Sequence, residues 1–112
     1  MDSTEIRLNI LDEDFRAKGQ EAINLVRKYA ENTEGWHIAP DNREGIRISF
    51  DLNGIADAGW FLLRLSVHDP VMPLNVESDT SGGVKIMLTA LYQALRGIKG
   101  INLEPIEKAI KA

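Results

Sequence analysis

The sequence contains no cysteine. Disulfide bonds and thiolate metal sites are therefore excluded, and cysteine usage says nothing about the redox compartment. An excess of basic residues is also missing, because 13 Lys and Arg stand against 17 Asp and Glu, for a net charge of −4. Nucleic-acid binding depends on Lys and Arg that neutralise backbone phosphates, so we expect no nucleic-acid partner. Any recognition of a phosphate group must be local.

Long apolar runs are missing as well. No stretch approaches the roughly 20 apolar residues that a helix needs to cross a bilayer. The first residues, Met1 to Glu5, have neither the basic region nor the apolar stretch of a signal peptide. We therefore expect a cytoplasmic protein without a membrane partner.

The composition that is present is that of an ordinary globular protein, with 44% hydrophobic and 27% charged residues. A chain of 112 residues can bury one core but has too little surface to divide between two. The expected organisation is a single domain over residues 1–112.

Apolar periodicity predicts the elements of the first third. Ile6, Leu8 and Ile10 alternate with polar residues, which is typical of a half-buried strand. A helix is predicted over 13–31, where apolar residues recur at helical spacing and Asp12 or Asp14 offers an N-cap oxygen.

The rest of the chain predicts mostly strands and a second helix. The expected elements are a short strand at 36–38, strands at 46–50 and 60–63 joined by a turn at 51–54, a loop at 66–73, a strand at 74–77, a helix over 84–95 with Ser81 as its N-cap, and a last short turn or helix at 103–111. This order predicts an α+β fold, with two helices packed on one face of a mostly antiparallel sheet.

The strongest candidate site follows the most buried predicted strand, in the segment from Arg64 to Pro70. A guanidinium can hold two oxygens of a phosphate or carboxylate, and a hydroxyl and loop N–H groups can complete an anion cradle. Arg64, Ser66 and the N–H groups of Val67 and His68 are the expected donors, and the His68 imidazole can add another. The plainer alternative is a solvated arginine followed by residues that favour turns.

Other candidate sites have plainer explanations. Ser81-Gly82-Gly83 can bind an anion at a helix start, but an ordinary cap needs fewer assumptions. The acidic run at 12–14 suits a helix start better than a metal. His37 has no second ligand at metal spacing, and Asp51-Leu52-Asn53-Gly54 lacks the remaining ligands of a calcium loop. We therefore assign no metal site.

Several motifs resemble the C-terminal domain of the α-D-phosphohexomutases, the phosphomannomutase/phosphoglucomutase family. They are Glu44-Gly45 before a strand, Gly59-Trp60-Phe61-Leu62-Leu63-Arg64, then Ser66 and Asp69-Pro70, and Val76-Glu77-Ser78. The likeness is strong over about the central third, and the flanking helices agree in order. It implies a TBP-like domain, excised from a four-domain isomerase that interconverts hexose 1-phosphate and hexose 6-phosphate.

The resemblance also implies roles for individual residues. Arg64 and Ser66 match the family's donors to the phosphate that is not transferred, and Val67 contributes only its N–H. His68 stands where threonine is usual, and Pro73 and Asn75 lie where many members place another arginine, which lowers the expected positive charge.

The family's motifs for phosphoryl transfer are missing. The chain has no Ser-His-Asn-Pro phosphoserine loop, no Asp-x-Asp-x-Asp magnesium loop and no Gly-Glu-x-Ser sugar loop. The isolated domain should therefore be inactive, with Mg²⁺ expected in the full-length enzyme and no cofactor in this domain. The expected partners are a phosphosugar and the other domains of the enzyme.

Two alternatives from other classes stay open. A free-standing regulatory or protein-interaction module can use an exposed sheet face. An RNA-binding sheet needs exposed aromatics and a basic face, which the acidic composition disfavours.

Overall fold

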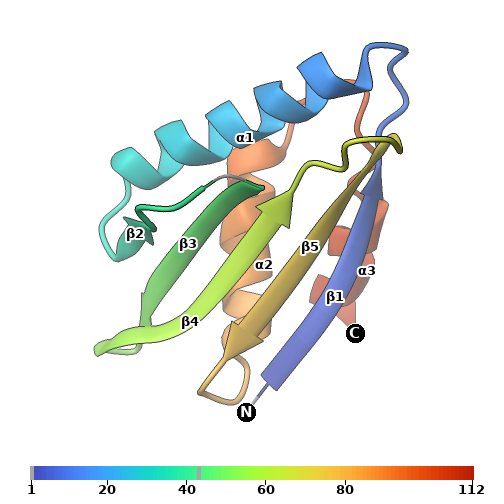
Figure 1. Ribbon diagram of the computed structural model, residues 1–112. Coiled ribbons are helices and arrows are strands. Elements are labelled where there is room, and N and C mark those ends of the chain that lie inside the picture. Colours follow the sequence, from blue (N-terminus) through green and yellow to red (C-terminus); the bar gives the residue numbers. More distant parts are fainter. Residues whose placement is uncertain (1, 43) are drawn as a thin grey trace.

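The computed structural model describes residues 2–42 and 44–112 (Figure 1). Its elements are β1 (Asp2–Asn9), α1 (Phe15–Glu31), β2 (Trp36–Ile38), β3 (Gly45–Leu52), β4 (Ile55–Arg64), β5 (Val71–Ser78), α2 (Gly83–Leu95) and α3 (Glu104–Lys111). The predicted α+β class is confirmed. A third helix, α3, forms where the sequence left a choice between a turn and a helix.

The five strands form one antiparallel sheet in the order β1-β5-β4-β3-β2. The first strand therefore lies beside the last, with Asp2 opposite Ser78 and Asn9 opposite Val71. The strands β2 to β5 follow one another as a meander. This order leaves β1 and β2 at the edges and places β4 in the centre.

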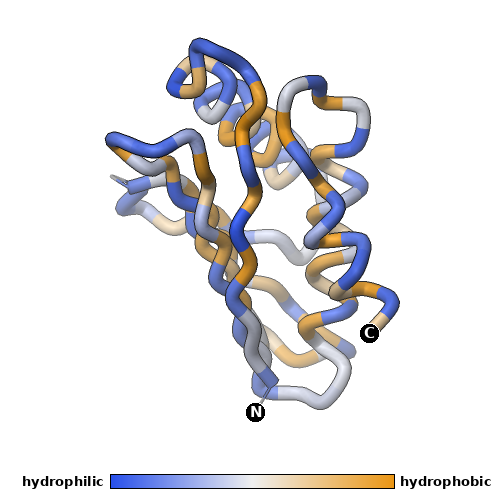
Figure 2. Tube along the Cα trace, turned by 90° about the vertical axis from the view of Figure 1, so that its right-hand side faces the viewer, coloured by the Kyte–Doolittle hydropathy of each residue, from blue (hydrophilic) through white to orange (hydrophobic). Residues whose placement is uncertain are grey.

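The helices cover one face of the sheet (Figure 2). Alternate residues of each strand point toward them, and Leu8, Ile48, Phe61 and Leu74 are completely buried there. The opposite face carries polar and half-buried side chains. At its centre the Arg47 guanidinium lies 4.2 Å from the ring centroid of Trp60. Helices on a single face were predicted from the order of the elements.

Strand β5 begins at Val71, so the predicted loop over 66–73 was too long. The prediction treated Pro73 as a residue that ends strand pairing, because proline has no N–H to donate. Pro73 instead lies within β5 and opposite Arg7 of β1.

Strand geometry explains how this proline is accommodated. The Pro70 carbonyl accepts from the Ile10 N–H at 2.8 Å, and the Val71 carbonyl accepts from the Ser66 N–H at 3.4 Å. Successive residues from Pro70 onward thus bond to opposite neighbours, so the backbone nitrogen and carbonyl of Pro73 face β4 rather than β1. The ladder between β4 and β5 does end there, at the pair Leu63 and Leu74. Beyond this point β4 and β5 diverge.

The helix starts differ from prediction in detail. α1 begins at Phe15, two residues later than expected, and Asp14 is its N-cap, since its carboxylate accepts from the Ala17 N–H at 3.2 Å. The predicted cap of α2, Ser81, was wrong. Gly82 occupies that position with a left-handed backbone at φ 81° and no side-chain cap bond, a conformation that glycine adopts without a steric penalty.

Among the described residues, no helix has both the length and the apolar character needed to span a membrane.

Candidate functional site

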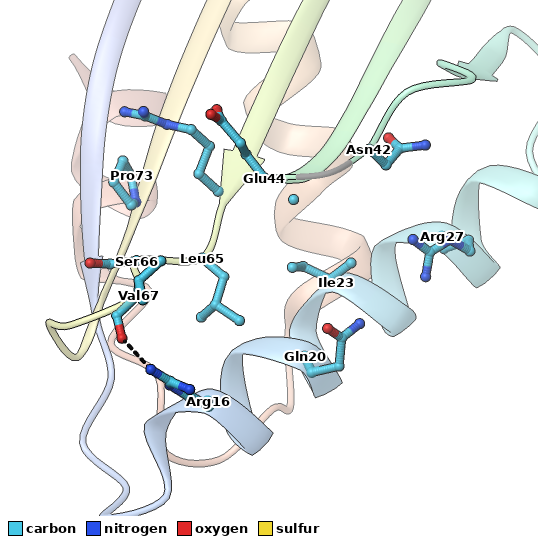
Figure 3. A pocket seen from close by; sticks show the side chains of 12 residues that line it. Arg16, Gln20, Ile23, Arg27, Asn42, Glu44, Leu65, Ser66, Val67 and Pro73 are labelled. Carbon is cyan, nitrogen blue, oxygen red and sulfur yellow. Dashed lines mark hydrogen bonds between the residues drawn. The ribbon is translucent and has the colours of Figure 1, made fainter.

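A groove with a volume of about 740 Å³ opens where β4 ends (Figure 3). One wall is the first part of α1, and the other is the segment that leaves β4 toward β5, together with the start of β3. Pro73 also lines it. The groove therefore lies at the point where the β4–β5 ladder stops.

Three of the four residues predicted to bind phosphate line this groove, namely Arg64, Ser66 and Val67. His68 is the next residue of the same loop, and it is exposed and does not line the groove. The structure thus brings three of the predicted residues together and leaves the His68 side chain outside.

Arg64 is the last residue of β4 and is half-buried. Its Nε is shielded from solvent. Within residues 2–42 and 44–112 this Nε has no hydrogen-bond partner, and no carboxylate forms an ion pair with the guanidinium. Buried polar groups in folded proteins nearly always have a partner. This unmatched donor makes Arg64 a candidate for contact with a group from outside the chain.

The loop after Arg64 offers further donors. The Ser66 Oγ accepts from the Asp69 N–H at 3.3 Å, which leaves the hydroxyl proton of Ser66 available. The backbone N–H groups of Val67 and His68 have no acceptor in the described part of the chain. A hydroxyl and two amide hydrogens thus lie close to Arg64 in sequence and are free to bind an anion.

Two arginines of α1 that were not predicted as site residues add positive charge to the groove. Arg16 and Arg27 both line it, and their separation of about three helical turns places them on one face of the helix. The Arg27 Nη1 donates to Asn24 Oδ1 at 3.1 Å, while Arg16 bonds to the loop. Helical spacing was a usable signal, but nothing in the sequence showed that this face would meet the loop after β4.

The described lining residues carry a net positive charge. Three arginines, Arg16, Arg27 and Arg64, stand against one carboxylate, that of the exposed Glu44. The groove is thus a local basic region on a chain whose net charge is −4. This arrangement suits a small anion better than a cation.

Two glycines allow close packing around the groove. Gly45 pairs with Arg64, and a Cβ there would collide with the Leu63 carbonyl oxygen. On the other wall, a Cβ on Gly19 of α1 would overlap Cδ1 of Leu65. Glycine inside a helix costs about 1 kcal/mol relative to alanine, and here the space that a side chain would need is taken by Leu65.

A second polar cluster lies at the other end of the β3–β4 hairpin. Ligand atoms of His37, Asp51 and Asp57 lie within 4.8 Å of one another, and all three residues are exposed. No role was predicted for His37, because no carboxylate stands at metal spacing from it in the sequence. Strand pairing supplies two, since β2, β3 and β4 bring together residues that are distant in sequence.

The groups of this cluster bond to one another. His37 Nε2 lies 3.1 Å from both oxygens of Asp51, and Asp51 Oδ1 accepts from the Asp57 N–H at 3.0 Å. The Ser49 hydroxyl donates to Asp57 Oδ1 at 3.1 Å. The Asp57 N–H, followed by the His37 side chain, lowers the pKa of Asp51 below its ordinary value of 3.8. The cluster therefore ties three strands together.

A comparison of the chain with protein-family models finds no match, and neither does a comparison with curated proteins. Inferences about function therefore depend on the residues themselves, on their motifs and on the geometry of the groove.

Proposed function

We propose that the groove at the end of β4 binds the phosphate group of a phosphorylated hexose. The chain would be the C-terminal, TBP-like domain of a cytoplasmic phosphomannomutase/phosphoglucomutase, an isomerase that interconverts hexose 1-phosphate and hexose 6-phosphate. The observation that carries the proposal is the buried Arg64 Nε without a partner. The phosphohexomutase-like motifs around Gly59-Trp60 and Arg64 supply the substrate class.

The proposed roles follow from the donors. The Arg64 guanidinium presents a planar fork to two phosphate oxygens, with the Ser66 hydroxyl and the N–H groups of Val67 and His68 on the remaining ones. Such contacts bind and orient the substrate and exclude water, as the lids and hinged domains of other enzymes do.

The groove itself does not suit Mg²⁺, which prefers carboxylates, phosphates and water as ligands. Its described lining has one carboxylate and three guanidinium groups. The proposal therefore assigns the ion and the phosphoryl-transferring serine to other domains of the full-length enzyme. The isolated chain would bind phosphate but would not transfer it.

The test is Arg64→Ala, studied in the chain and in the full-length enzyme. In the chain, titration with inorganic phosphate and with glucose 6-phosphate, followed by ¹⁵N NMR, should show an affinity loss of about tenfold to a hundredfold. In the enzyme, kcat/KM should fall by a similar factor. Arg47→Ala is the matched control, because Arg47 lies on the same open sheet face but stacks on Trp60. Unchanged affinity and unchanged kinetics in Arg64→Ala would rule out the proposed role.

The alternative is a regulatory or protein-interaction module that uses the open face of the sheet. Half-buried Trp60 and Leu62 at the centre of that face favour contact with another protein surface. In that case the phosphate titration would give no loop shifts, and changes such as Leu62→Glu would abolish function while Arg64→Ala would not.

A further inference from the structure

We propose that Arg16 of α1 is a positioning residue, which turns the backbone N–H of His68 toward the side of the sheet where Arg64 emerges. This inference rests on the proposed function, because it concerns how the same anion site is assembled.

The first observation is a hydrogen bond between distant parts of the chain. Arg16 Nη2 donates to the Val67 carbonyl oxygen at 2.9 Å, across 51 positions of sequence (Figure 3). In that view Ser66 and Val67 lie between Arg16 on the helix and Pro73 on the sheet. The guanidinium thus holds the middle of the loop from the helix side.

Peptide geometry then fixes the direction of the next amide. The chain has no cis peptide bond among its described residues, and in a trans peptide the C=O and the following N–H point in opposite directions. Because the Val67 carbonyl points toward α1, the His68 N–H points away from α1. That N–H has no acceptor within the described chain.

Arg64 emerges on the same side. Leu63 is fully buried beneath the helices, and successive strand residues point to opposite faces, so Arg64 leaves β4 on the face that α1 does not cover. Pro73 alternates in the same way with buried Met72 and Leu74. The free N–H and the guanidinium are therefore directed away from α1, toward the part of the groove that Pro73 lines, where an anion can meet both.

The start of the loop is also fixed before any ligand arrives. The Leu65 N–H donates to the Glu44 carbonyl at 3.1 Å, and the Leu65 side chain fills the space left by Gly19. With Arg16 holding Val67, two residues of this segment, Leu65 and Val67, are anchored to Glu44 and to α1. Such preorganisation lowers the ordering cost of binding.

The experiment compares Arg16→Ala, Arg16→Lys and Arg27→Ala in the 112-residue chain by ¹⁵N NMR, with inorganic phosphate as the probe. In the absence of phosphate, Arg16→Ala should shift the His68 amide resonance and increase its fast motion, and phosphate affinity should fall about three- to tenfold. Arg16→Lys, which keeps a donor and the charge, should restore part of both. Arg27→Ala also removes a cation from the groove, but it should leave the His68 amide of the free chain unchanged.

The outcomes separate the two proposals. If the unaltered chain binds phosphate and Arg16→Ala binds it equally well, or if the His68 amide is the same in both, the inference on Arg16 fails alone. If Arg27→Ala and Arg16→Ala give the same amide spectrum and the same loss of affinity, Arg16 acts through charge and not through position. If the unaltered chain shows no phosphate-dependent shift in its loop, the proposed function fails and the inference fails with it.

Discussion

The β3–β4 hairpin carries a polar cluster at each end, and the two differ in how their hydrogen bonds are satisfied. At the turn end, His37, Asp51 and Asp57 bond to one another. At the groove end, the Arg64 Nε and the N–H groups of Val67 and His68 have no partner among the described residues.

This difference bears on which of the two clusters can bind a ligand. Groups that satisfy each other have little to offer a ligand, and their bonds stabilise the turn that carries them. Donors left without acceptors cost free energy unless a ligand or water completes them. By this criterion the groove end is the better candidate for a ligand site, although the turn end has the residue types of a metal site.

The largest expected effect tests the backbone that builds the groove. Gly45→Ala should lower the free energy of unfolding by about 3 kcal/mol, because the new Cβ collides with the Leu63 carbonyl oxygen, which belongs to the backbone and cannot move aside. Gly54→Ala at the turn end is the control: it has φ 80° but no neighbour within 4 Å, so it should cost only about 1 kcal/mol. Urea unfolding of both variants measures the difference, and equal losses would contradict it.

A smaller effect is expected at the other wall of the groove. Gly19→Ala gains about 1 kcal/mol of helix propensity but must displace Leu65. Overall stability should therefore change little, while phosphate affinity should fall about threefold because the loop shifts.

The Leu65→Ala background provides the control for this prediction. There the overlap is absent, so Gly19→Ala should be plainly stabilising and should leave phosphate affinity at the level of Leu65→Ala alone. If the free-energy changes of the two substitutions are additive, Gly19 and Leu65 are not energetically coupled.

The smallest effect concerns pH at the turn end. The Asp57 N–H and then His37 lower the pKa of Asp51 in the folded chain. The carboxylate therefore adds stability that is fully present above the pKa of the unfolded chain and is lost as the pH falls through the lower folded value. Carbon-detected NMR titration should find this lowered pKa, and His37→Ala should raise it only part of the way. A full return to the ordinary value would mean that the Asp57 N–H has no effect.

Much of the fold followed from local pattern. Alternation at Ile6, Leu8 and Ile10 indicated a strand, and helical spacing located α1 and α2 to within two residues. The failures involved glycine and proline, whose effects depend on their neighbours. Pro73 remained compatible with a strand because its missing N–H faces β4, and Gly82 replaced Ser81 as a cap because the turn requires a left-handed residue.

The residues of the candidate site likewise fall into those predicted from local sequence and those that were not. Arg64, Ser66 and Val67 were predicted because they are adjacent along the chain, where local residue chemistry suffices. Arg16 and Arg27, and the partners of His37, come from segments far away in sequence. No local sequence pattern could show that these residues lie close to the groove or to His37.

By itself, the sequence determined most of the elements, the α+β class and the run of donors that follows β4, because these depend on near neighbours and on apolar periodicity. Only the tertiary structure decided which donors remain unsatisfied and which arginines join them. Hydrogen-bond satisfaction is a property of distances between remote segments, and those distances are set when the helices pack on the sheet.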